Sequence, residues 1–223
     1  WKYQEEKFSA NLYVSEVKRF IESIEQDPHD EIMFREADFA RPKFLSGEET
    51  LTSAQKGTAV HAVLENIDFS TEYTPQSIAE LILSLRERGL LSDKEAESIN
   101  VKKIMVFLES RLCRRMRESG KVYKETPFAM EMTPFEIFGK EEYKKYNEAI
   151  LVHGMIDCFF VENDSLVLVD YKTDYVRHGE EHKLKEKYYI QLGLYKRALE
   201  KSYGMPVSQT CIFSLSTGNE IVF

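Results

Sequence analysis

Two aspartates and a lysine interrupt a stretch of the sequence that is otherwise strongly apolar. Asp157 lies in the string IDCFF, and Asp170 and Lys172 close the string LVLVDYK. A carboxylate buried beside apolar residues is costly unless a cation or hydrogen bonds compensate it. Two carboxylates on neighbouring strands can hold an oxygen-preferring dication such as magnesium, with the lysine as a basic group beside it. The alternative is an ordinary Asp–Lys ion pair near a sheet edge, because D-x-K by itself is a common string.

The surrounding residues predict that a β-hairpin positions these groups. Apolar residues dominate Leu151–Glu162 and Ser165–Tyr171, and the pair Asn163-Asp164 between them is typical of a tight turn. Side chains alternate along a strand, so Asp170 and Lys172 are expected on the same face.

The chain before this hairpin is predicted to be mostly helical. Apolar residues recur there with a helical period, and after Ser119-Gly120 the period changes to two. The order of elements predicts an α/β protein with an α-helical N-terminal portion. We expect helices over Leu12–Ile24, from Thr52 or Ser53 onward, from Thr74 to Gly89, from Ser92 onward, over Val101–Arg117 and over Lys183–Tyr203, and further strands over Val122–Glu131 and Val207–Leu215.

Composition excludes several classes of protein. Of the 223 residues 43% are apolar and 30% are charged, as in an ordinary globular protein, and the net charge of −8 is not typical of a nucleic-acid binder, although it says nothing about local patches. No run is long enough to span a bilayer and the first residues are not a signal peptide, so we expect no membrane partner. Because the chain does not begin with Met, we expect it to be a piece of a longer protein.

Cysteine usage predicts a reducing compartment. Cys113, Cys158 and Cys211 are odd in number and show no CxxC spacing. This pattern argues against a zinc knuckle, a disulfide framework and a four-cysteine iron–sulfur cluster.

Five strings stand in a fixed order along the chain: GTAVH (Gly57–His61), KETPF (Lys124–Phe128), GMIDCFF (Gly154–Phe160), LVDYKTD (Leu168–Asp174) and YIQLGLY (Tyr189–Tyr195). Together they resemble the motifs of the PD-(D/E)XK nuclease superfamily, in its RecB-like branch. With the flanking strings SEVKRF and ARPKFL, the spacing is most similar to the C-terminal nuclease domain of the AddA subunits of AddAB helicase–nucleases.

This resemblance implies a fold and a division of the chain. The fold is a restriction-endonuclease-like core, in which a mixed central sheet is flanked by helices. Residues 52–223 would form the RecB-like nuclease domain, with a helical part at 52–119 and the sheet core at 120–223. Residues 1–51 would form an N-terminal helix and a connecting segment.

The resemblance also implies a metal site. Its ligands would be His61, Asp157, Asp170 and the backbone carbonyl of Tyr171. We expect Mg²⁺ as the cofactor, and Mn²⁺ as a possible substitute because imidazole is a softer ligand than magnesium prefers.

Further residues are implied to act beside the metal. Lys172 would position the attacking water or stabilise the transition state, while Gln191 and Tyr195, four apart on one helix face, would contact the backbone of the cut strand. Both could instead serve only in packing. Glu125 remains open as a ligand or an edge-strand charge, and Asp174 matches the family string without a chemical role of its own.

The implied function is that of a magnesium-dependent exonuclease. It would hydrolyse single DNA strands during the processing of double-strand breaks for recombinational repair, in the bacterial cytoplasm. A helicase motor would feed it the strand, in a heterodimer with an AddB-type subunit. The string G-x-x-x-x-G-K-[ST] does not occur in the chain, so ATPase activity is expected only in a longer protein. The alternative is a catalytically silent module that docks or guides DNA.

Overall fold

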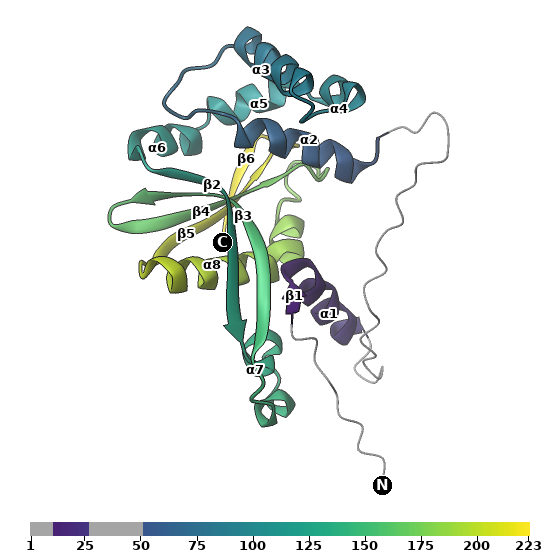
Figure 1. Ribbon diagram of the computed structural model, residues 1–223, viewed down its shortest axis with the longest axis vertical. Helices are drawn as coiled ribbons and strands as arrows, with labels where there is room; N and C mark the ends of the chain where they lie inside the picture. Colours follow the sequence, from purple (N-terminus) through teal and green to yellow (C-terminus); the bar gives the residue numbers. More distant parts are fainter. Residues whose placement is uncertain (1–10, 27–50) are drawn as a thin grey trace. The chain divides into compact units, whose positions relative to one another are not determined.

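The computed structural model describes residues 11–26 and 51–223 (Figure 1). The chain forms two compact units, a smaller one of residues 1–48 and 127–155 and a larger one of residues 49–126 and 156–223. Every candidate site residue belongs to the larger unit. The predicted division into domains at residue 52 stays a prediction, and the ARPKFL string lies outside the described residues.

The smaller unit contains short elements. The strand β1 pairs in parallel with the beginning of β3, with Asn11 opposite Leu151. The predicted helix over Leu12–Ile24 therefore begins two residues later, after this strand. The polar segment that follows β2 contains two short helical elements. The elements of this unit are β1 (Asn11–Tyr13), α1 (Val14–Gln26), α7 (Pro134–Phe138) and the 3-10 helix η1 (Glu141–Lys145).

The larger unit combines a bundle of helices with a mixed sheet, as predicted. The strands β2 and β3 continue into it from the smaller unit. Its elements are α2 (Ser53–Glu65), α3 (Pro75–Glu87), α4 (Asp93–Ser98), α5 (Val101–Leu108), α6 (Arg111–Ser119), β2 (Val122–Met132), β3 (Ile150–Glu162), β4 (Ser165–Lys172), α8 (His182–Tyr203), β5 (Val207–Ser214) and β6 (Asn219–Val222).

Side chains at the first turn of the helices explain where they begin. The side chains of Thr52, Thr74 and Ser92 each accept a hydrogen bond from the backbone N–H of the third helical residue, and the side chain of that residue accepts one from the backbone N–H of the cap. These capping boxes satisfy amide groups that the helix itself leaves unpaired. The predicted cap at Thr74, with Pro75 as the first helical residue, is confirmed.

One predicted helix is in fact two. The apolar period over Val101–Arg117 continues through Ser110, but the helix is interrupted there. The Ser110 side chain accepts a hydrogen bond from the backbone N–H of Cys113 and so caps the start of α6. A serine makes such a cap more readily than it continues a helix.

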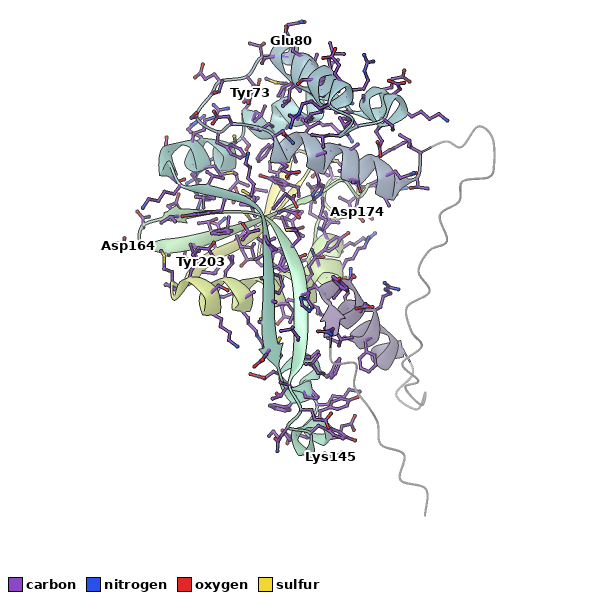
Figure 2. The ribbon with its side chains drawn as sticks, viewed as in Figure 1. Tyr73, Glu80, Lys145, Asp164, Asp174 and Tyr203 are labelled. Carbon is purple, nitrogen blue, oxygen red and sulfur yellow. The ribbon has the colours of Figure 1, made fainter. Side chains whose placement is uncertain are left out.

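The hairpin of β3 and β4 is confirmed. The strands pair antiparallel from Cys158 opposite Val169 to Glu162 opposite Ser165. Both turn residues, Asn163 and Asp164, have positive φ angles (49° and 56°), as a type I′ turn requires. Figure 2 shows Asp164 at the tip of this hairpin. The strand β4 pairs in parallel with β5, and α8 connects the two along the chain. The strand β5 pairs antiparallel with β6.

The two faces of β4 have different surroundings. Val167, Val169 and Tyr171 belong to the apolar core that β4 shares with α2, α3, α5 and α6. Asp170 faces the opposite way, toward α8, where Gln191 contacts it. Alternation along one strand therefore places the backbone of residue 171 and the carboxylate of residue 170 between two helical layers. No helix in the described ranges is both long and apolar enough to cross a membrane.

Arg115 of α6 points toward the sheet and not to solvent. Its guanidinium donates two hydrogen bonds to the carboxylate of Glu162, at 2.9 and 2.7 Å, and a third to Gln209 at 2.9 Å. It also lies 5.5 Å from the centre of the Phe160 ring. A fork of donors matches a carboxylate geometrically, so this one side chain ties α6 to β3 and β5.

We therefore predict that Arg115→Ala lowers the free energy of unfolding by about 2 kcal/mol, because it leaves a partly buried carboxylate without its donors. The matched variant is Arg114→Ala, at the neighbouring and exposed position, which should change stability by less than about 0.5 kcal/mol. Urea denaturation measures both. Equal stability of the two variants would contradict this role of Arg115.

Candidate active site

The carboxylate of Asp170 is fully buried at the end of β4. Gln191 on α8 donates a hydrogen bond to Oδ1 at 3.0 Å, and the ammonium of Lys172 lies 2.6 Å from Oδ2. Burial raises the pKa of Asp170 to about 7, against the opposing effect of the Lys172 charge, and Asp157 raises it further. Because its pKa is raised, the ionised form of this carboxylate is only partly stabilised by its neighbours, and a further positive charge nearby would stabilise it.

Asp157 and His61 meet at the backbone of Tyr171. Oδ2 of Asp157 accepts a hydrogen bond from the Tyr171 amide at 2.9 Å, and Nε2 of His61 lies 3.0 Å from the Tyr171 carbonyl. The other ring nitrogen, Nδ1, is 3.6 Å from Oδ2 of Asp157. When Nε2 carries the proton, the lone pair of Nδ1 points toward the Asp157 carboxylate. Nδ1 and Oδ2 are then two electron-pair donors side by side, an arrangement that suits a cation bound between them.

Glu125, whose role the sequence leaves open, joins this group. Ligand atoms of His61, Glu125 and Asp157 all lie within 4.8 Å of one another. Burial raises the pKa of Glu125 to about 7, and the neighbouring carboxylates Asp157, Glu65 and Asp170 add to the shift. Glu125 also has a φ angle of 40° within β2, a backbone conformation that is uncommon outside glycine and often occurs at functional sites.

The residue before Glu125 explains why β2 brings it to His61. The ammonium of Lys124 donates hydrogen bonds to the backbone carbonyls of Glu65 and Ile67, the second at 2.6 Å. These carbonyls lie at and just beyond the end of α2, where a helix leaves acceptors unpaired and favours positive charge. Lys124 therefore ties β2 to the end of the helix that carries His61.

A glycine lets α2 lie against the end of the sheet. A Cβ atom at Gly57 would be only 3.0 Å from the side-chain hydroxyl of Thr173. His61 is one turn further along the same helix, so this close contact sets the distance between its ring and the Tyr171 carbonyl.

The predicted site residues are brought into two adjoining groups. His61, Asp157 and the Tyr171 carbonyl form one, which Glu125 enters. Asp170 and Lys172 belong to the other with Gln191, whose amide also lies 3.1 Å from the hydroxyl of Tyr195. Asp170 is not among the residues whose ligand atoms lie within 4.8 Å of one another. The roles of these residues stay predictions.

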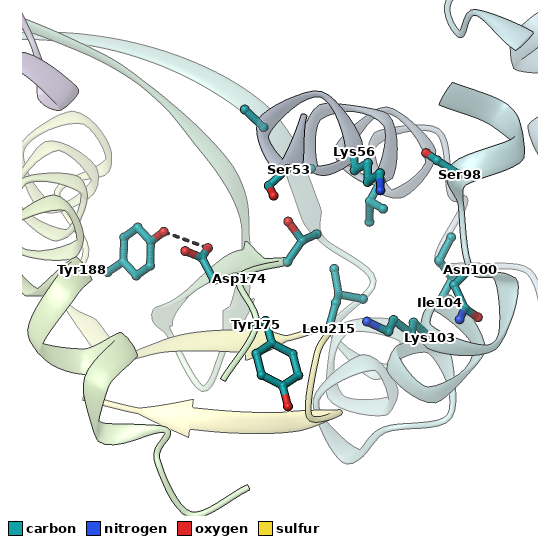
Figure 3. A pocket seen from close by; sticks show the side chains of 14 residues that line it. Ser53, Lys56, Ser98, Asn100, Lys103, Ile104, Asp174, Tyr175, Tyr188 and Leu215 are labelled. Atoms are coloured by element: carbon teal, nitrogen blue, oxygen red, sulfur yellow. Dashed lines mark hydrogen bonds between the residues drawn. The ribbon is translucent and has the colours of Figure 1, made fainter. Parts of the chain in front are cut away.

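Asp174 has a structural partner that the sequence did not indicate. Its carboxylate accepts hydrogen bonds from Lys187 and from the hydroxyl of Tyr188, the latter at 2.9 Å, and Figure 3 shows the bond to Tyr188. The Tyr188 ring lies 4.5 Å from the ammonium of Lys172. Asp174 thus fixes the ring on which the lysine rests, a favourable contact between a cation and an aromatic face. The sequence pattern indicates only that Tyr188 is a buried residue of the helix.

The donor set fits a dication. One imidazole nitrogen, several carboxylate oxygens and a backbone carbonyl suit magnesium or manganese. The pKa values of Asp170 and Glu125 are raised, and the buried Oδ2 of Asp170 has no partner among the described residues beyond the Lys172 ammonium. Both observations indicate excess negative charge. A cavity of about 430 Å³ opens onto His61 and Glu125, between α2 and β2.

We predict that Gly57→Ala weakens binding of Mn²⁺ about tenfold, because the added methyl group displaces α2 and with it His61. Calorimetric titration of the protein with MnCl₂ measures this. The matched variant is Gly193→Ala in α8, where a Cβ meets nothing within 4 Å. It should leave Mn²⁺ binding unchanged and raise stability by roughly 0.5–1 kcal/mol. Equal Mn²⁺ affinities in the two variants would contradict the prediction.

Comparison with known proteins agrees with this geometry. The family model of the PD-(D/E)XK nuclease superfamily matches residues 33–220. Three relatives whose names describe them as ATP-dependent helicase/nuclease subunits are similar over nearly the whole chain. The protein of Ruminiclostridium cellulolyticum is 37% identical over 226 residues, covering 100% of this chain and 18% of the relative. That of Thermoanaerobacter sp. (strain X514) is 38% identical over 212 residues (94% and 17%), and that of Bacillus cytotoxicus is 35% identical over 235 residues (100% and 18%).

This chain thus spans less than a fifth of the length of these relatives. The family and the fold class expected from the sequence are confirmed by the family match. The resemblance to the nuclease domain of AddA-type proteins is confirmed by the relatives. The mixed sheet, the cluster of potential metal-binding side chains and the match over residues 33–220 lead to the same conclusion: the chain belongs to the PD-(D/E)XK nuclease superfamily.

Proposed function

We propose that this chain is a metal-dependent deoxyribonuclease that hydrolyses single DNA strands within an AddAB-type helicase–nuclease. The observation that carries the proposal is the meeting of His61, Glu125 and Asp157 beside the buried pair of Asp170 and Lys172. In the longer protein we expect a helicase motor and an AddB-type partner, acting on double-strand breaks in the bacterial cytoplasm. The names of the relatives support this assignment.

His61, Asp157, Asp170 and the Tyr171 carbonyl would hold the metal, and Glu125 is a further candidate ligand. Bound Mg²⁺ or Mn²⁺ would polarise the phosphate and lower the pKa of a water molecule. The protein's own groups do the rest. They hold the scissile phosphate and neutralise the charge that develops on it.

Lys172 is the group best placed to neutralise that charge. Its ammonium lies between the carboxylate of Asp170 and the face of Tyr188, and only 13% of its side chain is exposed. The pKa of Lys172 is raised, because the attraction of Asp170 and Asp157 exceeds the effect of burial. The side chain therefore stays a cation, which suits stabilisation of a phosphate more than removal of a proton from water.

Gln191 orients the buried carboxylate. Its amide donates to Oδ1 of Asp170 and lies within hydrogen-bond distance of the Tyr195 hydroxyl. Burial raises the pKa of Tyr195 well above its usual value, so this hydroxyl keeps its proton and can donate it to a phosphate oxygen. Tyr195 would thus contact the phosphate backbone of the substrate, and Gln191 would link Tyr195 to Asp170, the proposed metal ligand.

Cleavage of end-labelled single-stranded DNA at low salt tests this function. We expect degradation with Mg²⁺ or Mn²⁺ and none with EDTA. Asp170→Ala and Lys172→Met should each slow it about 1,000-fold, because several kcal/mol of charge stabilisation are lost. Asp93→Ala, at an exposed position of α4, serves as the control with unchanged activity. No cleavage by the wild-type chain under any metal condition would contradict the proposal.

Glu125 gives a second prediction, for the metal-free protein. Its pKa rises from 4.5 to about 7 on folding, so the folded protein binds this proton more tightly than the unfolded chain does. The resulting contribution favours folding at low pH and is lost as the pH rises through 7. Glu125→Gln removes the charge and should therefore be more stable than the wild type at pH 8, by a few degrees in Tm, and nearly equal to it at pH 5.

Thermal unfolding in EDTA across this pH range measures the difference. Added Mg²⁺ should reverse it, since the wild type then gains more stability from binding than the variant does. A difference in Tm that is independent of pH would show that Glu125 is not the group responsible.

A further inference from the structure

A second cavity lies beside the candidate active site and has no part in the chemistry proposed above. It has a volume of about 620 Å³ and lies between α2, α5 and the loop that follows β4. Figure 3 shows Lys56 and Lys103 on one side of it, and Asp174 and Tyr188 on the other. Its size is within the range of about 300–1,000 Å³ that is typical of sites for ligands of the size of a nucleotide.

The charge of this cavity contrasts with that of the chain as a whole. Two lysines line it in a protein of net charge −8. In the described part of the chain neither ammonium has a carboxylate partner. The one carboxylate in the lining, Asp174, is already bound to Lys187 and Tyr188. The cavity therefore offers two uncompensated positive charges to an anion.

An aromatic ring and small polar groups complete the lining. Tyr175, directly after Asp174, is 84% exposed, and the cavity is also lined by Ser53, Ser98 and Asn100. Exposed single aromatic residues are ordinary, but this one lines the same cavity as the two lysines. Cationic side chains that contact phosphates, together with an aromatic face on which a base stacks, are what binds single-stranded nucleic acid without sequence preference.

This cavity adjoins the one that opens onto His61 and Glu125. Ala54 and Gly57 line both cavities. Thr173, the residue after Lys172, lines the second cavity and faces Gly57. The two cavities therefore adjoin along α2, so a strand whose phosphate lies at His61 would continue into the cavity lined by Lys56 and Tyr175.

We propose that this second cavity is a subsite for the nucleotide next to the scissile phosphate of a single DNA strand. Lys56 and Lys103 bind the phosphates of that nucleotide, and its base stacks on Tyr175. The inference rests on the proposed function, since it takes the strand being cut as the ligand. A free mononucleotide, the product of cutting, has the same chemistry, so the experiment compares the two.

The test is binding of a short fluorescent oligo(dT) by the whole chain in EDTA, followed by anisotropy over a series of NaCl concentrations. The double variant Lys56→Ala/Lys103→Ala should bind roughly tenfold more weakly at low salt. The slope of log K against log salt should fall by about 1.4, at about 0.7 for each lost phosphate contact with a single strand. The matched control is Lys102→Ala/Lys121→Ala, which removes equal charge from exposed positions outside the cavity and should leave most of the affinity and slope.

Tyr175 is tested in the same assay. Tyr175→Ala should weaken binding roughly tenfold, with an unchanged salt slope, while Tyr175→Phe keeps the stacking face and the affinity. Tyr189→Ala removes another exposed tyrosine, on α8 outside the cavity, and should have no effect. dTMP as competitor should displace the oligonucleotide only at far higher concentration, because it offers a single phosphate.

Two results would overturn the inference and leave the proposed nuclease intact. One is cleavage by the wild type together with equal binding by the cavity variants and their controls. The other is that dTMP displaces the oligonucleotide as effectively as unlabelled oligo(dT) does, and that the variants lose affinity for dTMP but not for the oligonucleotide. The cavity would then be a pocket for the product. Absence of both oligonucleotide binding and metal-dependent cleavage in the wild type would count against the proposed function itself.

Discussion

The burial of the Asp170 carboxylate is the constraint on which the site depends. A fully buried carboxylate is costly unless positive charge and hydrogen bonds surround it. Lys172 and Gln191 supply part of this compensation from β4 and α8. The pKa of Asp170 nevertheless remains raised, so the protein alone does not fully stabilise its charge. A buried carboxylate with a raised pKa is more typical of a functional site than of a group that stabilises the fold.

The other proposed ligands reach this carboxylate from a different part of the fold. His61 comes from a helix on the opposite side of the sheet and approaches through the backbone of Tyr171. That approach requires α2 to lie very close to the end of β4, and Gly57 and Lys124 hold it there. The two layers around the sheet thus meet at its end, where both can contribute to one site.

The conformation and the surroundings of Glu125 lower the stability of the fold. Glu125 combines an uncommon backbone angle with a carboxylate that is surrounded by other carboxylates. Neither feature helps the protein to fold, and the carboxylate of Glu125 lies close to His61 and Asp157. Such local cost is frequent where binding or catalysis depends on a fixed arrangement.

The hairpin with Asp157, Asp170 and Lys172 was predictable from the sequence, because alternation and a tight turn are local properties of a few residues. The order of the five motifs also pointed to the family. The position of Glu125 and the contact between Asp174 and Tyr188 depend instead on tertiary packing. It also formed the cavity beside the site and turned Arg115 inward. These features join residues that are distant along the chain or on different elements, so they depend on how closely helices pack on the sheet, which no local pattern encodes.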